Sequence, residues 1–218
     1  MGGRGLGRRE GSAAVNAAKK DAGSTAKVPS AKERGVRTRR RIAEAALALL
    51  EENEHPPTAK EIAARAEVSH RLVFHHFQDL ESLLAMVAAL QVERYRNVRA
   101  EVSPHLPLAE RVEQTVKHRF TLYESMGHLG SNVSALAGRV QAVADGAADV
   151  HEILRARLEH TFRAELDAAG RRGRELLCAI DTAVSWHVWD YLQRVNQLSP
   201  AATRRVMVQL LEGAVSVH

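Results

Sequence analysis

The sequence lacks the features that secreted and membrane-spanning proteins require. Its one cysteine, Cys178, excludes an internal disulfide and fits a reducing cytosol. No run of 18 uncharged apolar residues occurs, so we expect no membrane span. The basic start MGGRGLGRRE is not followed by the apolar stretch of a secretory signal. These absences predict a cytoplasmic protein with no membrane partner.

Residues that favour β-strands are also scarce. Aromatic residues make up 4% of the 218 residues and prolines number six, whereas Ala and Leu are abundant. This balance favours helices, because strands are enriched in β-branched and aromatic residues. With 45% hydrophobic residues the chain can build a packed core, as one large domain or two small ones. We therefore expect an all-α fold.

The positive charge is concentrated at the N-terminal end. Residues 1–41 contain 12 Lys and Arg and three acidic residues, so with a net charge of +5 overall, residues 42–218 carry −4. A basic segment on a mildly acidic body indicates a polyanionic partner met by that segment. A solubilising tail would produce the same charge pattern, and charge alone does not separate the two interpretations.

Residues 1–34 are predicted to be a disordered basic arm. They are rich in Gly, Ala, Ser, Lys and Arg, and their only large apolar side chains are Met1, Leu6, Val15 and Val28. So little apolar surface cannot offset the entropy lost on ordering. The folded part of the chain is therefore expected to begin at about residue 35.

The first predicted helix of the folded part ends near Glu52. Its apolar face follows the helical spacing i, i+3, i+4, i+7, i+8. The sequence EHPP over residues 54–57 stops this helix, because proline cannot continue it. The residues of the apolar face are Ile42, Ala45, Ala46, Leu49 and Leu50.

Two shorter helices are predicted next. A capping box over residues 58–61 opens a two-turn helix, and Ser69 caps another helix over residues 70–77. Val73 and Phe77, four residues apart, are expected in the core. The opposite, solvent-facing side then holds His70, Arg71, Phe74 and His75.

Two short helices joined by a three-residue turn are typical of a helix-turn-helix, whose second helix lies in the DNA major groove. An ordinary helical hairpin in an all-α protein would give the same pattern. Two features favour the DNA-binding interpretation. Phe74 is predicted to be exposed beside Arg71 and two histidines, and the helix N-termini at Thr58 and Ser69 offer N–H groups suited to phosphate.

The segment from about Arg37 to Ala88 resembles the DNA-binding domain of the TetR (tetracycline-repressor-like) family of transcriptional regulators. The matching stretches are RRRIAEAALALL, TAKEIAARAEVS and VFHHFQDLESLL, and the segment that contains them is about a quarter of the chain. The resemblance implies a DNA-binding domain over 35–83 and a helical effector-binding and dimerisation domain over 84–218. It also implies a homodimer that binds a palindromic operator in double-stranded DNA and a small effector, with no cofactor and no enzymatic activity.

The resemblance assigns DNA contacts residue by residue. Thr58 and His76 match phosphate contacts, Lys60 matches a base or phosphate contact, and the exposed side of the recognition helix matches base- and backbone-facing positions. Arg71 is the best candidate for a bidentate guanine contact. The full predicted set is Arg39, Arg40, Arg41, Thr58, Lys60, Ser69, His70, Arg71, Leu72, Phe74, His75 and His76.

Three residues depart from the family pattern. Glu67 replaces the usual glycine of the turn, and a positive φ there would cost about 1 kcal/mol. Phe74 replaces a phosphate-binding tyrosine, and Leu80 replaces the usual lysine. Two backbone contacts are therefore expected to be missing, and the arginine run 39–41 and the arm are candidates to replace them.

The rest of the chain is predicted to be helical, with helices over about 80–101, 132–144, 149–169, 175–197 and 201–216, and another ending near residue 125. The last two carry long apolar stripes. These stripes either close a monomeric core or, as the resemblance implies, form a four-helix dimer interface. The predicted interface residues are Ile180, Val184, Val188, Tyr191, Val206, Leu210 and Ala214.

The effector pocket is expected among the helices between residues 80 and 197. The candidate lining is mostly apolar, which predicts an apolar or amphipathic ligand such as an acyl chain or an aromatic compound. The candidates are Met86, Leu90, Phe120, Tyr123, Met126, Asn132 and Trp186.

The sequence therefore predicts a homodimeric DNA-binding repressor that a small ligand releases from its operator. A ligand-independent architectural regulator or an activator is the first alternative. An α-helical enzyme or interaction protein with a basic tail is an alternative of another class. No phosphate loop, nucleophile elbow, zinc-protease motif or paired-cysteine motif occurs, and no metal site is expected.

Overall fold

The computed structural model describes residues 30–98 and 101–216, and every regular element within these two stretches is helical. The all-α prediction is therefore confirmed for this part of the chain. No helix in the described stretches is long and apolar enough to cross a membrane. Most of the predicted arm, residues 1–29, lies outside the described residues.

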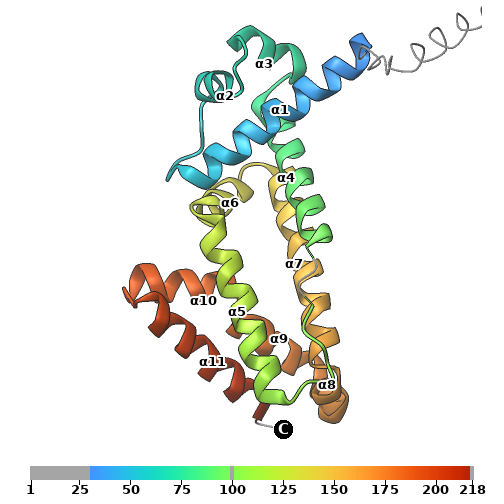
Figure 1. The fold of residues 1–218 in the computed structure, drawn as a ribbon, viewed down its shortest axis with the longest axis vertical. Coiled ribbons are helices and arrows are strands. Elements are labelled where there is room, and N and C mark those ends of the chain that lie inside the picture. The colour runs from blue at the N-terminus through green and yellow to red at the C-terminus, as the bar shows by residue number, and fades with distance from the viewer. Residues whose placement is uncertain (1–29, 99–100, 217–218) are drawn as a thin grey trace, which may run out of the picture.

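The N-terminal end of the molecule holds three helices, α1 (Ala31–Glu52), α2 (Ala59–Arg65) and α3 (His70–His76) (Figure 1). Helix α1 begins before the predicted boundary at residue 35, which corrects the predicted arm over 31–34. The reason is a capping box, in which Ser30 accepts from the N–H of Glu33 and Glu33 accepts from the N–H of Ser30. The core predictions for Val73 and Phe77 are confirmed, because both are buried.

The turn between α2 and α3 contains a strained residue. Glu67 has φ +52°, in the left-handed region that glycine adopts without a Cβ clash. Glu67, which replaces the usual glycine of the family, therefore adopts a strained backbone conformation. The side chain is exposed, so no packing contact compensates for the strain.

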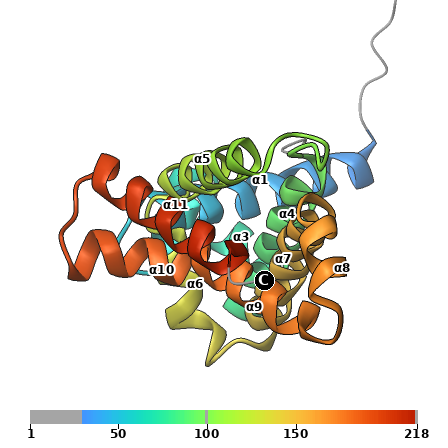
Figure 2. The ribbon, with the colours of Figure 1, turned by 90° about the horizontal axis from the view of Figure 1, so that it is seen from below.

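The rest of the chain forms an elongated helical body below α1–α3 (Figure 1). Helices α10 and α11 lie along one side of it, away from α7 and α8 (Figures 1 and 2). Its elements are α4 (Leu80–Asn97), α5 (Leu108–Met126), α6 (Leu129–Ala137), α7 (Gln141–Thr161), α8 (Arg163–Ala169), a short 3-10 turn (Gly170–Arg172), α9 (Gly173–Ala183), α10 (Trp186–Asp190), a π-helical turn (Tyr191–Val195) and α11 (Pro200–Ser216).

Several predicted helix boundaries in this body are wrong, because the predicted helices over 132–144 and 149–169 are replaced by α6, α7 and α8. Helix α7 runs through Gly146, where a break was expected. Gly146 serves packing instead, because a Cβ there would lie 2.7 Å from the Cβ of Ala88 on α4. The predicted single helix over 175–197 is interrupted after Ala183, where the Ser185 side chain accepts from the N–H of Val188 and caps α10.

The body and the N-terminal helices meet at the carboxyl end of α1. The amide of Asn132 donates to the carbonyls of Leu50 (2.9 Å) and Asn53 (2.8 Å), and the N–H of His128 donates to the carbonyl of Glu51 (2.9 Å). These bonds satisfy carbonyls that the end of a helix leaves without partners. The start of α6 is thereby fixed to the end of α1.

The hydrophobic core consists of two clusters. One joins α1–α4 with Leu129 of α6 and Val143 of α7, and the other joins α5, α7 and α9–α11. Met126 packs against both clusters. The N-terminal helices are therefore packed onto the body rather than tethered by a free linker.

Replacing Glu67 with glycine should stabilise the protein. Glycine removes the left-handed strain of about 1–2 kcal/mol but raises the entropy of the unfolded chain by about 0.5–1 kcal/mol, so we expect a net gain of about 0.5–1 kcal/mol. Urea unfolding of Glu67→Gly and Glu67→Ala measures it. Glu67→Ala removes the side chain but keeps the Cβ, so it should show no gain. An equal gain in both variants would assign the effect to the carboxylate instead.

Candidate DNA-binding surface and ligand cavity

The outer face of α3 matches the sequence prediction. His70, Arg71, Phe74 and His75 are all exposed, and Phe74 retains 48% of its accessible surface. The ring of His70 packs edge-on against that of Phe74, with 4.9 Å between the centroids. An exposed aromatic ring flanked by a guanidinium and imidazoles can meet base edges, sugars and phosphates in a major groove.

His76 sits where α3 ends and is only partly exposed. Partial burial, the neighbouring His75 and the charge of Arg39 lower the pKa of His76 below its usual value. Its ring lies edge-on to that of His75, with 5.4 Å between the centroids. In the free protein His76 is therefore biased towards the neutral form.

Two of the three predicted arginine contacts are engaged within the protein. Arg39 donates to the carbonyl of His76 (2.6 Å), and its guanidinium lies 4.4 Å from the centre of the Phe77 ring. This cation–π contact joins α1 to the end of α3. Arg39 is thus a brace for the recognition helix in this conformation, which the arginine pattern in the sequence did not indicate.

Arg40 is held by carboxylates, at 2.8 Å from Glu44 and 3.7 Å from Glu93. Arg41 and Lys60 are exposed. The arrangement favours these two side chains over Arg39 and Arg40 as contacts to a phosphate backbone.

The hydroxyls predicted to meet phosphate cap their own helices. Thr58 accepts from the N–H of Glu61 and donates to its carboxylate (2.7 Å), and Ser69 accepts from the N–H of Leu72. Both caps are exposed, whereas the Leu72 side chain is half-buried. The caps orient α2 and α3, and a phosphate at Thr58 would have to share a hydroxyl that Glu61 already holds.

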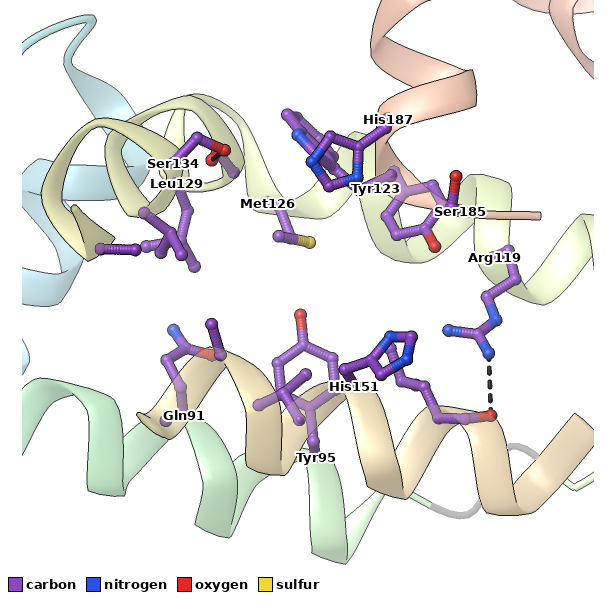
Figure 3. Close-up of a pocket in the computed structure, with 18 of the residues that line it drawn as sticks. Gln91, Tyr95, Arg119, Tyr123, Met126, Leu129, Ser134, His151, Ser185 and His187 are labelled. Atoms are coloured by element: carbon purple, nitrogen blue, oxygen red, sulfur yellow. Dashed lines mark hydrogen bonds between the residues drawn. The ribbon is translucent and has the colours of Figure 1, made fainter. Parts of the chain in front are cut away.

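A large cavity of about 1220 Å³ lies within the body. Side chains from α4 and α7 form one wall, and side chains from α5, α6 and α10 form the other (Figure 3). Most of the lining is aliphatic or aromatic, with Leu84, Leu129, Val133, Leu136, Leu154 and Trp186 among it. This volume and lining fit a small organic ligand.

The predicted ligand residues divide into two groups. Tyr123, Met126 and Trp186 line the cavity. Met86, Leu90, Phe120 and Asn132 do not, and their assignment is corrected here. Met86 and Leu90 pack against the N-terminal core, Phe120 lies in the second core, and Asn132 bonds to α1.

Several polar side chains of the cavity were missed by the sequence analysis. They are Gln91, Tyr95, Arg119, Ser134, His151, Asp181 and His187. Burial raises the pKa of Tyr95 to about 12, so its phenol stays protonated. The helical spacing of Gln91 and Tyr95, four apart on α4, places them on one face and is the one signal that could have indicated them.

The residues predicted to form the dimer interface also fall into two groups, buried and accessible. Ile180 and Val184 are fully buried within the protomer's own core, which corrects their assignment. Tyr191 and Leu210 are exposed, and Val188, Val206 and Ala214 are half-buried. Val195 is exposed as well, so the π-helical turn and α11 carry three exposed apolar side chains, those of Tyr191, Val195 and Leu210. Helices α10 and α11 lie on one side of the body (Figure 2).

No group of three His, Cys, Asp or Glu side chains within residues 30–98 and 101–216 could hold a metal ion. The nearest arrangement is a pair at the cavity, where Nε2 of His151 lies 3.3 Å from the carboxylate of Asp181. Arg155 lies equally close to that carboxylate. Asp181 is therefore engaged by Arg155 and His151 at the cavity wall.

No family model and no curated protein matches this chain. Solved structures do match. A TetR-family regulator from Mesorhizobium loti has a TM-score of 0.65 and 18% identity, over 84% of this chain and 98% of its own. A transcriptional regulator from a Rhodococcus species has a TM-score of 0.60 and 18% identity, over 82% and 96%. Salmonella enterica GusR has a TM-score of 0.54 and 20% identity, over 83% and 96%. The chain thus has the fold of the TetR-family transcriptional regulators, an N-terminal helix-turn-helix domain on a C-terminal helical domain.

Proposed function

We propose that the protein is a sequence-specific DNA-binding transcriptional regulator, a homodimeric repressor that a small apolar or amphipathic ligand releases from a palindromic operator. The observation that carries the DNA-binding part is the outer face of α3. It presents Arg71, Phe74, His70 and His75 next to a helix-turn-helix core, with the partly exposed His76 at the end of the helix. The fold shared with transcriptional regulators supports the same conclusion.

The ligand response is supported by the contact between α6 and α1. Leu129 and Gly130 line the cavity, and the next turn of α6 carries Asn132, whose amide holds the carboxyl end of α1. A ligand that shifts α6 therefore acts on the helix that supports α2 and α3. Such a shift changes operator affinity only if the ligand binds the two arrangements with different affinities.

Arg71 tests base recognition. On an operator selected from a random duplex library, Arg71→Ala should weaken specific binding by about 1–3 kcal/mol and relax the preference at one base pair, because a bidentate guanine contact is lost. Binding curves on the operator and on random duplex measure the effect. The matched control is Arg41→Ala, which should weaken both duplexes alike. Equal losses on both duplexes for Arg71→Ala would make Arg71 a phosphate contact.

The pH dependence of DNA binding tests whether His76 contacts a phosphate. Its pKa is lowered in the free protein and should rise beside a phosphate, so DNA binding takes up a proton. Operator affinity should therefore increase as pH falls through the bound-state pKa, by up to about tenfold per pH unit per histidine, and level off below the free-state pKa.

Operator titrations between about pH 8 and about pH 6 at constant salt measure this. His76→Gln should flatten part of the profile, and His55→Gln, on an exposed loop before α2, should leave it unchanged. A profile in His76→Gln identical to the wild type would remove His76 from the phosphate face. The lowered pKa also predicts that His76 costs stability below about pH 6.5, so unfolding is measured at each pH.

A substitution at Val195 tests the proposed dimer interface. It is 63% exposed, and it does not line the cavity, unlike its apolar neighbours Tyr191 and Leu210. A charge buried in an apolar interface is strongly unfavourable, so Val195→Glu should give monomers and weak binding to a palindromic site. Light scattering after size-exclusion chromatography at micromolar concentration measures the mass. Ala168→Glu, on the exposed side of α8, is the control that should stay dimeric. A monomeric wild type would refute the interface.

A further inference from the structure

The cavity contains a buried cation without a carboxylate partner. Arg119 lies on α5 and is only 7% exposed. Its Nη2 donates to the backbone carbonyl of Leu154 (2.8 Å), and among residues 30–98 and 101–216 no carboxylate lies within 4.0 Å of the guanidinium. A neutral carbonyl does not cancel a full charge, and a buried charge without a partner is unfavourable.

The other charges near Arg119 do not supply that partner. The carboxylate of Asp181 is shared by Arg155 and His151, each 3.3 Å away. Arg157 lies close enough for Arg119 to lower its pKa, and it donates to the carbonyls of Tyr95 and Val98.

Glu101, which raises the pKa of Arg157, is exposed to solvent. Arg119 is the one arginine and Asp181 the one carboxylate among the described residues that line the cavity, and Asp181 is already engaged by Arg155. The excess charge at this end of the cavity is positive.

The cavity is polar at this end and mostly apolar elsewhere. Figure 3 shows Arg119 at one end of the row of labelled side chains, and Leu129 and Ser134 at the opposite end. Tyr95 lies between the ends, and its phenol stays protonated and able to donate a hydrogen bond. Besides its hydrogen bonds to Leu154 and Tyr123, Arg119 has further N–H donors, enough for a bidentate contact to a carboxylate.

We propose that the cavity binds an elongated apolar carboxylate, with its headgroup on Arg119 and its tail among the aliphatic side chains towards Leu129 and Leu136. This inference rests on the proposed ligand-responsive function and names the chemical class of the effector. A neutral ligand of the same shape would leave the guanidinium without a counterion. A cationic ligand would add to the positive excess.

Three probes of one chain length separate these cases, namely decanoate, decanol and decylamine, each used below its micelle-forming concentration. Calorimetric titration of the full-length protein without DNA gives the affinities. We expect decanoate to bind at least about tenfold more tightly than decanol, and decylamine to bind most weakly, because charge-assisted contacts are the strong ones. Equal or tighter binding of decanol or decylamine overturns the proposal.

Arg119→Met removes the charge and keeps an apolar side chain of comparable length. It should abolish the preference of decanoate over decanol, and Arg119→Lys should retain part of it. Leu136→Ala is the matched control at the tail end, where both probes should lose affinity by the same factor. A preference that persists in Arg119→Met refutes the role of Arg119. Should that variant not fold, the wild-type series still decides the proposal.

A separate DNA measurement keeps the two hypotheses apart. Binding to the selected operator is measured with and without decanoate. A protein that prefers decanoate but binds no DNA supports the carboxylate site and refutes the proposed regulator. A protein released from its operator by neutral compounds, with no preference for decanoate, supports the regulator and refutes the carboxylate site.

Discussion

The carboxyl end of α1 is the constraint on which the arrangement of the molecule depends. Its last carbonyls need donors, and α6 supplies them through the His128 N–H and the Asn132 amide. Gly127 makes the approach possible, since it has φ +53° and a Cβ there would collide with the Glu51 carbonyl. One tight turn thereby fixes the N-terminal helices α1–α3 to the wall of the cavity.

Helix α4 provides a second connection of the same kind. Its first half contributes Leu83, Leu84 and Val87 to the N-terminal core, and its second half contributes Gln91 and Tyr95 to the cavity. Between these two regions Ala88 lies so close to Gly146 on α7 that a larger residue than glycine would not fit there. Helix α4 therefore belongs at one end to the N-terminal core and at the other to the wall of the cavity, so a ligand there would contact it directly.

Sequence reasoning succeeded where local patterns determine the structure. The core positions Val73 and Phe77 and the exposed face of α3 follow from helical periodicity. The strain at Glu67 was indicated by the family resemblance, in which a glycine is usual at this position of the turn. It failed where contacts between residues far apart in the sequence determine which way a side chain faces. Arg119 lies on α5 between the core residues Val116 and Phe120, and only the packing of α7 reveals that it is buried without a carboxylate. Asn132 lies on the correct helix for the cavity but faces α1. Ile180 and Val184 belong to an apolar stripe, but they are buried in the protomer's own core.

The cavity and the proposed dimer face share residues, and this links the two proposals physically. Tyr191, Val206 and Leu210 line the cavity, and they also lie on the side where a second copy would pack. In such a dimer the partner would cover part of the cavity wall, so ligand and partner would contact the same side chains. Two binding events that use the same side chains are coupled. If the ligand changes the free energy of dimerisation, dimerisation changes the free energy of ligand binding by the same amount. In the proposed homodimer the spacing of the two α3 helices would depend on that arrangement. The proposed ligand would then have two routes to the DNA, one through α6 to α1 within a protomer and one through α10 and α11 between protomers.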